Sequence, residues 1–127
     1  MKKDTEYWIK ISKYDLSTAR AMMRSGRYLY VLFMCQQTIE KTLKGLIVEI
    51  KDIFPPKSHD LLKLANITEI DIDNSIQKLL SELSYYYIET RYPEDIININ
   101  KKVTKKKAGE YLSKTEELFK WLNQKLK

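Results

Sequence analysis

Glycine and proline are scarce in this chain, with three of each among 127 residues. All-β domains depend on frequent turns built from these residues, so their scarcity argues against a sandwich or a barrel. Cysteine and histidine occur once each, as Cys35 and His59. A single cysteine excludes an internal disulfide. One cysteine and one histidine, without carboxylates at ligand spacing, argue against a metal site. No apolar run approaches the roughly 20 residues of a membrane span, so we expect no membrane contact.

The composition indicates one folded domain covering residues 1–127. Hydrophobic residues make up 43% and charged residues 31% of the sequence, which is typical of a globular chain and not of a disordered one. The N-terminus is charged and amphipathic, unlike a signal peptide, so we expect a cytoplasmic protein. The glycines are too far apart for a glycine-rich phosphate loop, and we expect no bound cofactor. Cys35 lies on the apolar side of its segment, which favours a buried structural thiol over a reactive one.

Helical spacing of apolar residues recurs along the chain. It predicts helices over residues 4–24, 28–51, 60–66, 73–91 and 104–127. Asp4, Ser58 and Asp73 are the expected N-caps of the first, third and fourth of these helices. In the first helix the expected inward stripe includes Trp8, Ile11, Ala19 and Met22. Short connections between the helices indicate an all-α fold, an antiparallel up-and-down four-helix bundle with one extra short helix.

The helix over residues 28–51 carries a group of polar side chains in an otherwise apolar segment. A helix that is apolar all round is normally buried in the middle of a bundle. The exceptions fall in one arc, which we call the polar window: Gln36, Gln37, Glu40, Lys41 and Lys44. Buried polar groups are costly unless they are paired, so the polar window is either a satisfied internal network or the wall of a cleft or interface.

Three polar residues outside the polar window have two interpretations each. Asp15 interrupts the inward stripe of the first helix. Its carboxylate either accepts a hydrogen bond from Lys41 or Lys44 or contacts a ligand. His59 either ties the Pro-Pro loop to the bundle or takes part in catalysis. Arg91 either pairs with carbonyl groups or with Glu40, or it grips a phosphate. The candidates for a ligand site or a buried polar network are Asp15, Gln37, Glu40, Lys41, Lys44, His59, Arg91 and Tyr92.

Positive charge is concentrated at the end of the chain. Residues 101–127 hold nine of the 23 basic and three of the 17 acidic side chains, which leaves fourteen of each sign in residues 1–100. A basic stripe attracts phosphates, although a solvated helix face is the simpler interpretation. Aromatic residues are sparse there, which argues against stacking of single-stranded bases. The apolar second helix and the tyrosines at 85–87 offer more apolar surface than one bundle can cover, which predicts a homodimer.

The polar window and five other short motifs share their order and spacing with a known family. These motifs are Tyr7-Trp8, Asp15-Leu16, Arg27-Tyr28, Ser58-His59-Asp60-Leu61 and Glu89-Thr90-Arg91-Tyr92-Pro93. The set resembles HEPN-domain proteins (higher eukaryotes and prokaryotes nucleotide-binding) over about two-thirds of the chain. The resemblance implies a four-helix bundle similar to the C-terminal domain of kanamycin nucleotidyltransferase. It also implies dimerisation and a minimal nucleotidyltransferase partner in a toxin–antitoxin-like pair.

The best-understood activity of that family is RNA cleavage without a metal. Its signature is an arginine followed, after four to six residues, by a histidine, which suits acid–base chemistry beside a charged phosphate. Residues 52–54, where the arginine would stand before His59, contain no arginine, and residues 96–98, where the histidine would follow Arg91, contain no histidine. We therefore expect a non-catalytic HEPN subunit that binds a nucleotide, RNA or a nucleotidyltransferase. The alternative is a HEPN ribonuclease toxin with a non-standard catalytic set.

Overall fold

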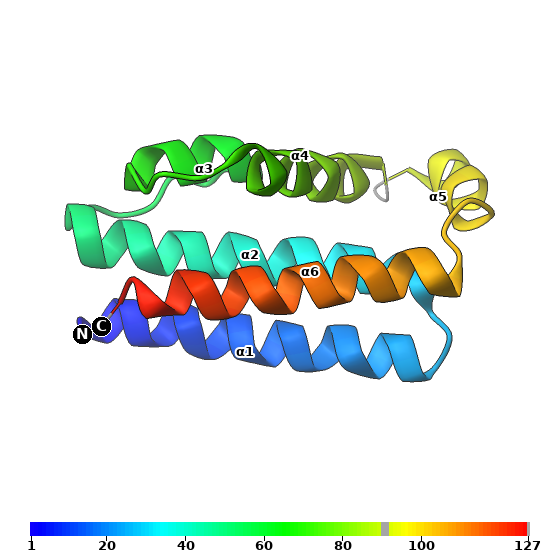
Figure 1. Ribbon diagram of the computed structural model, residues 1–127, viewed down its shortest axis with the longest axis horizontal. Coiled ribbons are helices and arrows are strands. Elements are labelled where there is room, and N and C mark those ends of the chain that lie inside the picture. Colours follow the sequence, from blue (N-terminus) through cyan, green and yellow to red (C-terminus); the bar gives the residue numbers. More distant parts are fainter. Residues whose placement is uncertain (90–91, 127) are drawn as a thin grey trace.

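The computed structural model describes residues 1–89 and 92–126, and the regular structure in these ranges is helical. The elements in chain order are α1 (Lys3–Arg24), α2 (Tyr28–Lys51), α3 (Leu61–Thr68), α4 (Asn74–Glu89), α5 (Pro93–Asn100) and α6 (Lys105–Gln124). The four long helices α1, α2, α4 and α6 alternate in direction, so the start of α1 and the end of α6 lie at the same end of the molecule (Figure 1). The predicted all-α antiparallel bundle is confirmed.

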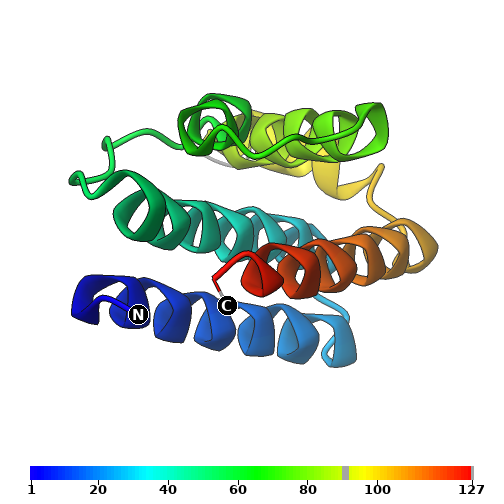
Figure 2. The same cartoon turned by 60° about the vertical axis from the view of Figure 1, so that its left-hand side comes forward.

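α2 is the central helix. It packs against α1 and α6 on one side and against α3 and α4 on the other, as Figures 1 and 2 show. α4 and α6 both pack on α2 but scarcely touch each other. The largest fully buried side chains of α2 are Leu32, Ile39, Leu43, Leu46 and Ile47. This burial explains why the apolar character of the segment extends around the whole helix.

Short polar residues cap three of the described helices, α3, α4 and α6. Asp73 accepts a hydrogen bond from the backbone of Ile76, as predicted for the cap of the fourth helix, and Thr104 accepts one from the backbone of Lys107. The expected cap of the third helix was wrong. Its cap is Asp60, whose carboxylate accepts from two backbone N–H groups, whereas the Ser58 hydroxyl accepts from the Asp60 backbone just outside the helix. The first helix begins earlier than expected, so Asp4 lies in its first turn and not at its cap.

Two further features differ from the prediction. α5 is a second short helix, with Tyr92 as its N-cap and Pro93 at its first position. Proline ends a preceding helix, but its fixed φ also suits the first turn of a new one. Ile11, expected on the inward stripe of α1, is exposed. The buried stripe consists of Thr5, Ile9, Ser12, Leu16 and Ala19, so small residues bring α1 close to α2.

Candidate functional site

Glu40 is the centre of the polar window. Its side chain is almost completely buried in the middle of α2. Oε1 accepts a hydrogen bond from Gln36 Nε2 at 3.0 Å and lies 2.7 Å from Nδ1 of His59. Oε2 accepts from Lys44 Nζ at 3.2 Å, and the Lys44 ammonium is buried with it. A buried carboxylate with three partners of this kind is a satisfied group and not an orphaned one.

The polar window continues toward α1. Gln37 Nε2 donates to Gln36 Oε1 at 2.7 Å, and Lys41 Nζ donates to Gln37 Oε1 at 2.8 Å. Lys41 Nζ also lies 3.7 Å from Oδ2 of Asp15 on α1. The contacts therefore form one connected chain that runs from Asp15, across the face of α2, to Glu40 and His59.

His59 joins the end of this chain to α4. Its backbone carbonyl accepts from Gln36 Nε2 at 3.1 Å, so both the ring and the main chain of His59 are held by α2. The ring packs on Tyr87 with 4.5 Å between centroids, and Tyr87 stacks in turn on Phe33 at 5.5 Å. The side chain of His59 is still 45% exposed, so this residue closes the network at the protein surface.

The two carboxylates of the network differ in their electrostatics. Burial by itself would raise the pKa of Glu40, but hydrogen bonds from Gln36 and His59 and the charge of Lys44 outweigh it, so the pKa of Glu40 is lowered. At Asp15 burial is the larger effect, and the pKa is raised despite the nearby charge of Lys41. Glu40 is therefore the fixed anion of the network, whereas Asp15 is the easier of the two to protonate.

The structure brings together most of the residues that the sequence singled out. Asp15, Gln37, Glu40, Lys41, Lys44 and His59 all belong to the connected network. Tyr92 does not: it is exposed at the start of α5 and has no contact with the network. Arg91 lies outside the described residues. Gln36 was placed in the polar window but not among the candidates, although its i, i+4 spacing from Glu40 predicts the contact that it makes.

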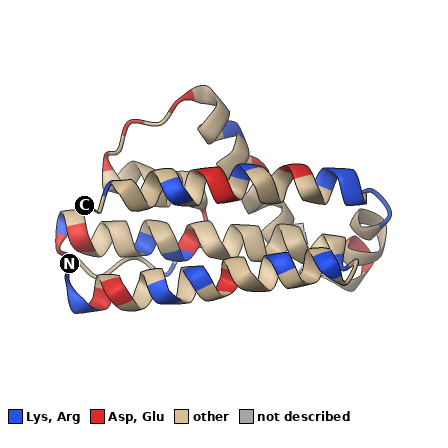
Figure 3. Cartoon of the chain, turned by 60° about the horizontal axis from the view of Figure 1, so that its bottom comes forward, with Lys and Arg blue, Asp and Glu red and all other residues tan. Residues whose placement is uncertain are grey.

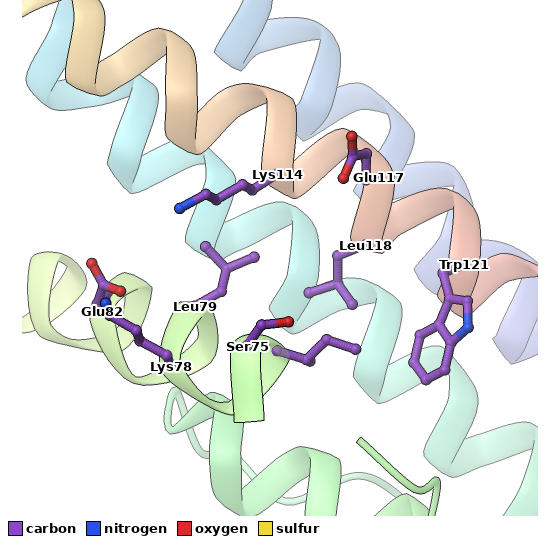
Figure 4. A pocket seen from close by; sticks show the side chains of 9 residues that line it. Ser75, Lys78, Leu79, Glu82, Lys114, Glu117, Leu118 and Trp121 are labelled. Carbon is purple, nitrogen blue, oxygen red and sulfur yellow. The ribbon is translucent and has the colours of Figure 1, made fainter. Parts of the chain in front are cut away.

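A second feature is a groove between α4 and α6, with a volume of about 510 Å³. Ile76 and Leu79 from α4 and Leu118 and Trp121 from α6 line it, and Lys78 and Lys114 lie at its edges (Figure 4). The groove exists because α4 and α6 each pack on α2 with their backbones apart, and the two helices contact each other through long side chains such as Tyr111 with Glu82 and Tyr86. Helical periodicity places apolar residues on one face but does not state whether two such faces touch, so the sequence could not locate this groove.

The groove opens toward the start of α6 into a depression of about 390 Å³. Its basic side chains are Lys78, Lys106, Lys107 and Lys114. None of these forms an ion pair with another described residue, whereas Glu82, which also lines the depression, is bound by the Tyr111 hydroxyl. Figure 3 shows the basic residues gathered at this end of α6. Three of the nine basic residues of the segment 101–127 thus line one depression together with Lys78, beside the carboxylates of Glu82 and Glu110, and we call it the lysine-lined hollow.

Conventional catalytic groups are not prominent in the part of the chain that the structure describes. Burial raises the pKa of the Cys35 thiol to about 12, so it is not a nucleophile at neutral pH. No group of three or more His, Cys, Asp or Glu side chains among the described residues could hold a metal ion. None of the described helices combines the length and the apolar character that a bilayer-crossing segment needs.

A bundle of four long helices around a buried polar network defines a helical module, and comparison with known proteins identifies its family. The model of the HEPN domain matches residues 5–125, so the chain belongs to the HEPN family. Two crystal structures share the fold: TT1696 from Thermus thermophilus and ST0689, an archaeal HEPN homologue. Among curated proteins none matches significantly.

The likeness to both structures extends over the whole fold. TT1696 has a TM-score of 0.83 and 23% sequence identity, covering 98% of this chain and 100% of its own. ST0689 has a TM-score of 0.75 and 25% identity, with both chains covered completely. The first of these likenesses shows the fold alone, and the family assignment rests on the domain match.

Proposed function

We propose that this chain is a non-catalytic HEPN subunit that binds a nucleotide or RNA and associates with a minimal nucleotidyltransferase in a toxin–antitoxin-like pair. The observation that carries the proposal is the state of its single histidine. His59 is held through its ring by Glu40 and through its carbonyl by Gln36, and no arginine stands at the ribonuclease spacing before it. These contacts anchor the loop that carries His59, and the missing arginine supports a binding role over RNA cleavage.

The phosphate-binding part of the proposal belongs on the lysine-lined hollow. From the sequence, Lys44, Arg91 and Tyr92 are the expected phosphate contacts. The ammonium of Lys44, however, is buried and paired with Glu40, so it is not available to a ligand. Lys78, Lys106, Lys107 and Lys114 are accessible and lie at the mouth of a groove that has an apolar floor and a tryptophan. Phosphate groups on these lysines are the contacts that this chemistry favours. The ring of Trp121 is already covered by the Lys125 ammonium, 4.5 Å from its centroid, so we expect no base to stack there.

Three further parts of the proposal rest on the family and the composition. A nucleotidyltransferase partner follows from the usual setting of HEPN subunits, which the resemblance implies. Self-association as a homodimer follows from the apolar surface that one bundle leaves uncovered. We place the protein in the cytoplasm, where such a partner and its nucleotide would be found.

One observation favours the alternative, a HEPN ribonuclease toxin with a non-standard catalytic set. A half-exposed histidine whose ring is oriented by a buried carboxylate resembles a general base with its positioning group. The contact at 2.7 Å is therefore consistent with proton transfer as well as with anchoring. The absence of a suitably spaced arginine to stabilise phosphate charge weighs against cleavage.

The proposal is tested with purified wild-type protein and a fluorescent single-stranded RNA. We expect no cleavage, and we expect binding that weakens as salt rises, because lysine–phosphate contacts on single strands give a salt slope of about −0.7 per contact. Lys107→Glu with Lys114→Glu should reduce binding at least tenfold, whereas Lys63→Glu, an exposed lysine on α3, should not. Cleavage that is lost in a folded His59→Ala variant would support the ribonuclease instead.

A further inference from the structure

An apolar surface on α1 and the loop after α2 is exposed without a partner. Tyr7, Ile11 and Tyr14 lie at i, i+4 and i+7 on the outer face of α1, and Ile53 and Phe54 follow the end of α2. We call these five residues the aromatic patch. Phe54 is 80% and Tyr14 74% exposed, and the other three are about half exposed.

We propose that the aromatic patch is the surface through which two copies of this chain pair. This inference rests on the proposed self-association and names the surface that carries it. The surface differs from the one that the sequence suggested on the helix over residues 28–51 and the tyrosines at 85–87. Most of α2 is covered by the other helices, with Tyr30 and Ile50 as its exposed large apolar residues. Apolar side chains of this size rarely gather on the exterior of a monomer unless the surface is used.

The patch is continuous and not a set of scattered residues. A hollow of about 390 Å³ joins its two parts, and Tyr7, Trp8, Val48, Phe54 and Pro55 form its apolar lining. Asp52, at the edge of this hollow, is paired with Lys2 at 2.8 Å, so its carboxylate is already compensated. Covering the hollow therefore does not strand that charge.

The size of the patch fits a dimer contact. A large aromatic side chain offers roughly 150–250 Å², so the exposed fractions of the five residues amount to about 600 Å² of apolar surface. A stable interface buries about 800 Å² on each partner, including its polar rim. The aromatic patch supplies the apolar centre of such an interface, and exposed polar residues of α1 such as Lys10, Lys13 and Ser17 supply a rim.

The shape of the patch favours a second copy over an unrelated partner. Phe54 projects from the surface directly beside the hollow that it helps to line. In a two-fold interface the same surface meets itself, so a projection and an adjacent hollow on one copy can each be matched by the other. An unrelated partner would need to supply both complementary shapes.

The mass of the purified protein at tens of micromolar, measured by light scattering, tests this proposal. We expect wild type at twice 15.1 kDa and the Phe54→Glu and Tyr14→Glu variants at 15.1 kDa. Ile97→Glu, an exposed apolar residue on α5, is the matched control and should leave the dimer intact. Circular dichroism should show the same helix content in every variant, because all three positions are exposed.

Two results would overturn the proposal. A dimer that survives both Phe54→Glu and Tyr14→Glu would show that the copies pair through another surface. A wild type that stays at 15.1 kDa, and forms a complex with a nucleotidyltransferase that Phe54→Glu abolishes, would assign the patch to that partner. The first result would refute the surface alone and leave the proposed self-association standing, whereas the second would refute the self-association as well. Neither result bears on RNA binding or cleavage, which the RNA assay tests separately.

Discussion

At the scale of single residues, Glu40 and Gln36 each have three partners in the polar network, and of these two Glu40 is the one that carries charge. Its two oxygens contact Gln36, His59 and Lys44, and each contact comes from a group that is otherwise buried or fixed. Removal of the carboxylate would leave the Lys44 ammonium without its counterion in the interior. The cost of an unpaired buried charge exceeds the net value of the pair itself.

We therefore predict that Glu40→Ala lowers the free energy of unfolding by about 3 kcal/mol or more, because it strands a buried cation. Denaturant unfolding followed by circular dichroism would measure this loss. Glu69→Ala provides the control, since Glu69 pairs with Lys51 on the surface and its loss should have no measurable effect. Equal stability of Glu40→Ala and wild type would mean that the polar window is open to water.

The opposite pKa shifts of Glu40 and Asp15 predict opposite pH dependences. The lowered pKa of Glu40 stabilises the fold above its unfolded value of 4.5, and this contribution is lost as the pH falls through the folded value. The raised pKa of Asp15 favours the folded state while the group is protonated, and this contribution is lost as the pH rises from 3.8 through the folded value.

The free energy of unfolding, measured for each variant between pH 3 and pH 7, separates the contributions of Glu40 and Asp15. Compared with wild type, Glu40→Gln should be most destabilised at pH 7, with the difference shrinking on acidification. Asp15→Asn should compare more favourably with wild type at pH 7 than at pH 3. A constant stability difference across this range for either variant would contradict the corresponding shift.

At the scale of elements, the close approach of α1 to α2 fixes the geometry that brings Asp15 to Lys41. Gly45 is the contact point on α2. A Cβ atom at this position would lie 3.2 Å from both the Trp8 Cβ and the Ile9 Cδ1 on α1. This distance is tighter than an ordinary van der Waals contact, so the absence of a side chain lets the two helices pack at this separation.

We predict that Gly45→Val destabilises the protein by about 1–3 kcal/mol, because its branched side chain separates α1 from α2. Gly109 in α6 is the matched control, since a Cβ there would meet only Met23 Cε at 3.5 Å. Gly109→Ala should raise the free energy of unfolding by up to about 1 kcal/mol through helix propensity. Thermal unfolding of both variants checks the prediction. A Gly45→Val variant as stable as wild type would show that α1 can move away from α2 at no cost in stability.

At the scale of the whole molecule, the two proposed binding surfaces share no residue. The aromatic patch belongs to α1 and the loop after α2, and the lysine-lined hollow belongs to α4 and α6. Figure 1 places α1 and α4 on opposite sides of the central helix α2. A dimer formed through the aromatic patch would thus present two grooves. Charge reversal of the lysines in the groove should leave the mass of the dimer unchanged, and Phe54→Glu should leave each groove intact.

The sequence by itself determined the helical class, the positions of the long helices and the composition of the polar window. These follow from local rules: apolar spacing with the helical period, short polar caps and i, i+4 neighbours. The link between Glu40 and Lys44 belongs to this group, since both residues lie on one helix. Asp15 became a candidate because a carboxylate interrupted an apolar stripe.

Only the tertiary structure decided which helix faces meet. His59 reaches Glu40 because the loop between α2 and α3 folds back along α2. Ile11 is exposed because α1 buries a different stripe, in which Ile9 lies against Gly45. The groove likewise depends on how far apart α4 and α6 lie on α2, and the aromatic patch depends on which face of α1 the other described helices leave exposed. Helical periodicity specifies an apolar face for each element, but the long-range packing of all elements decides which faces are covered.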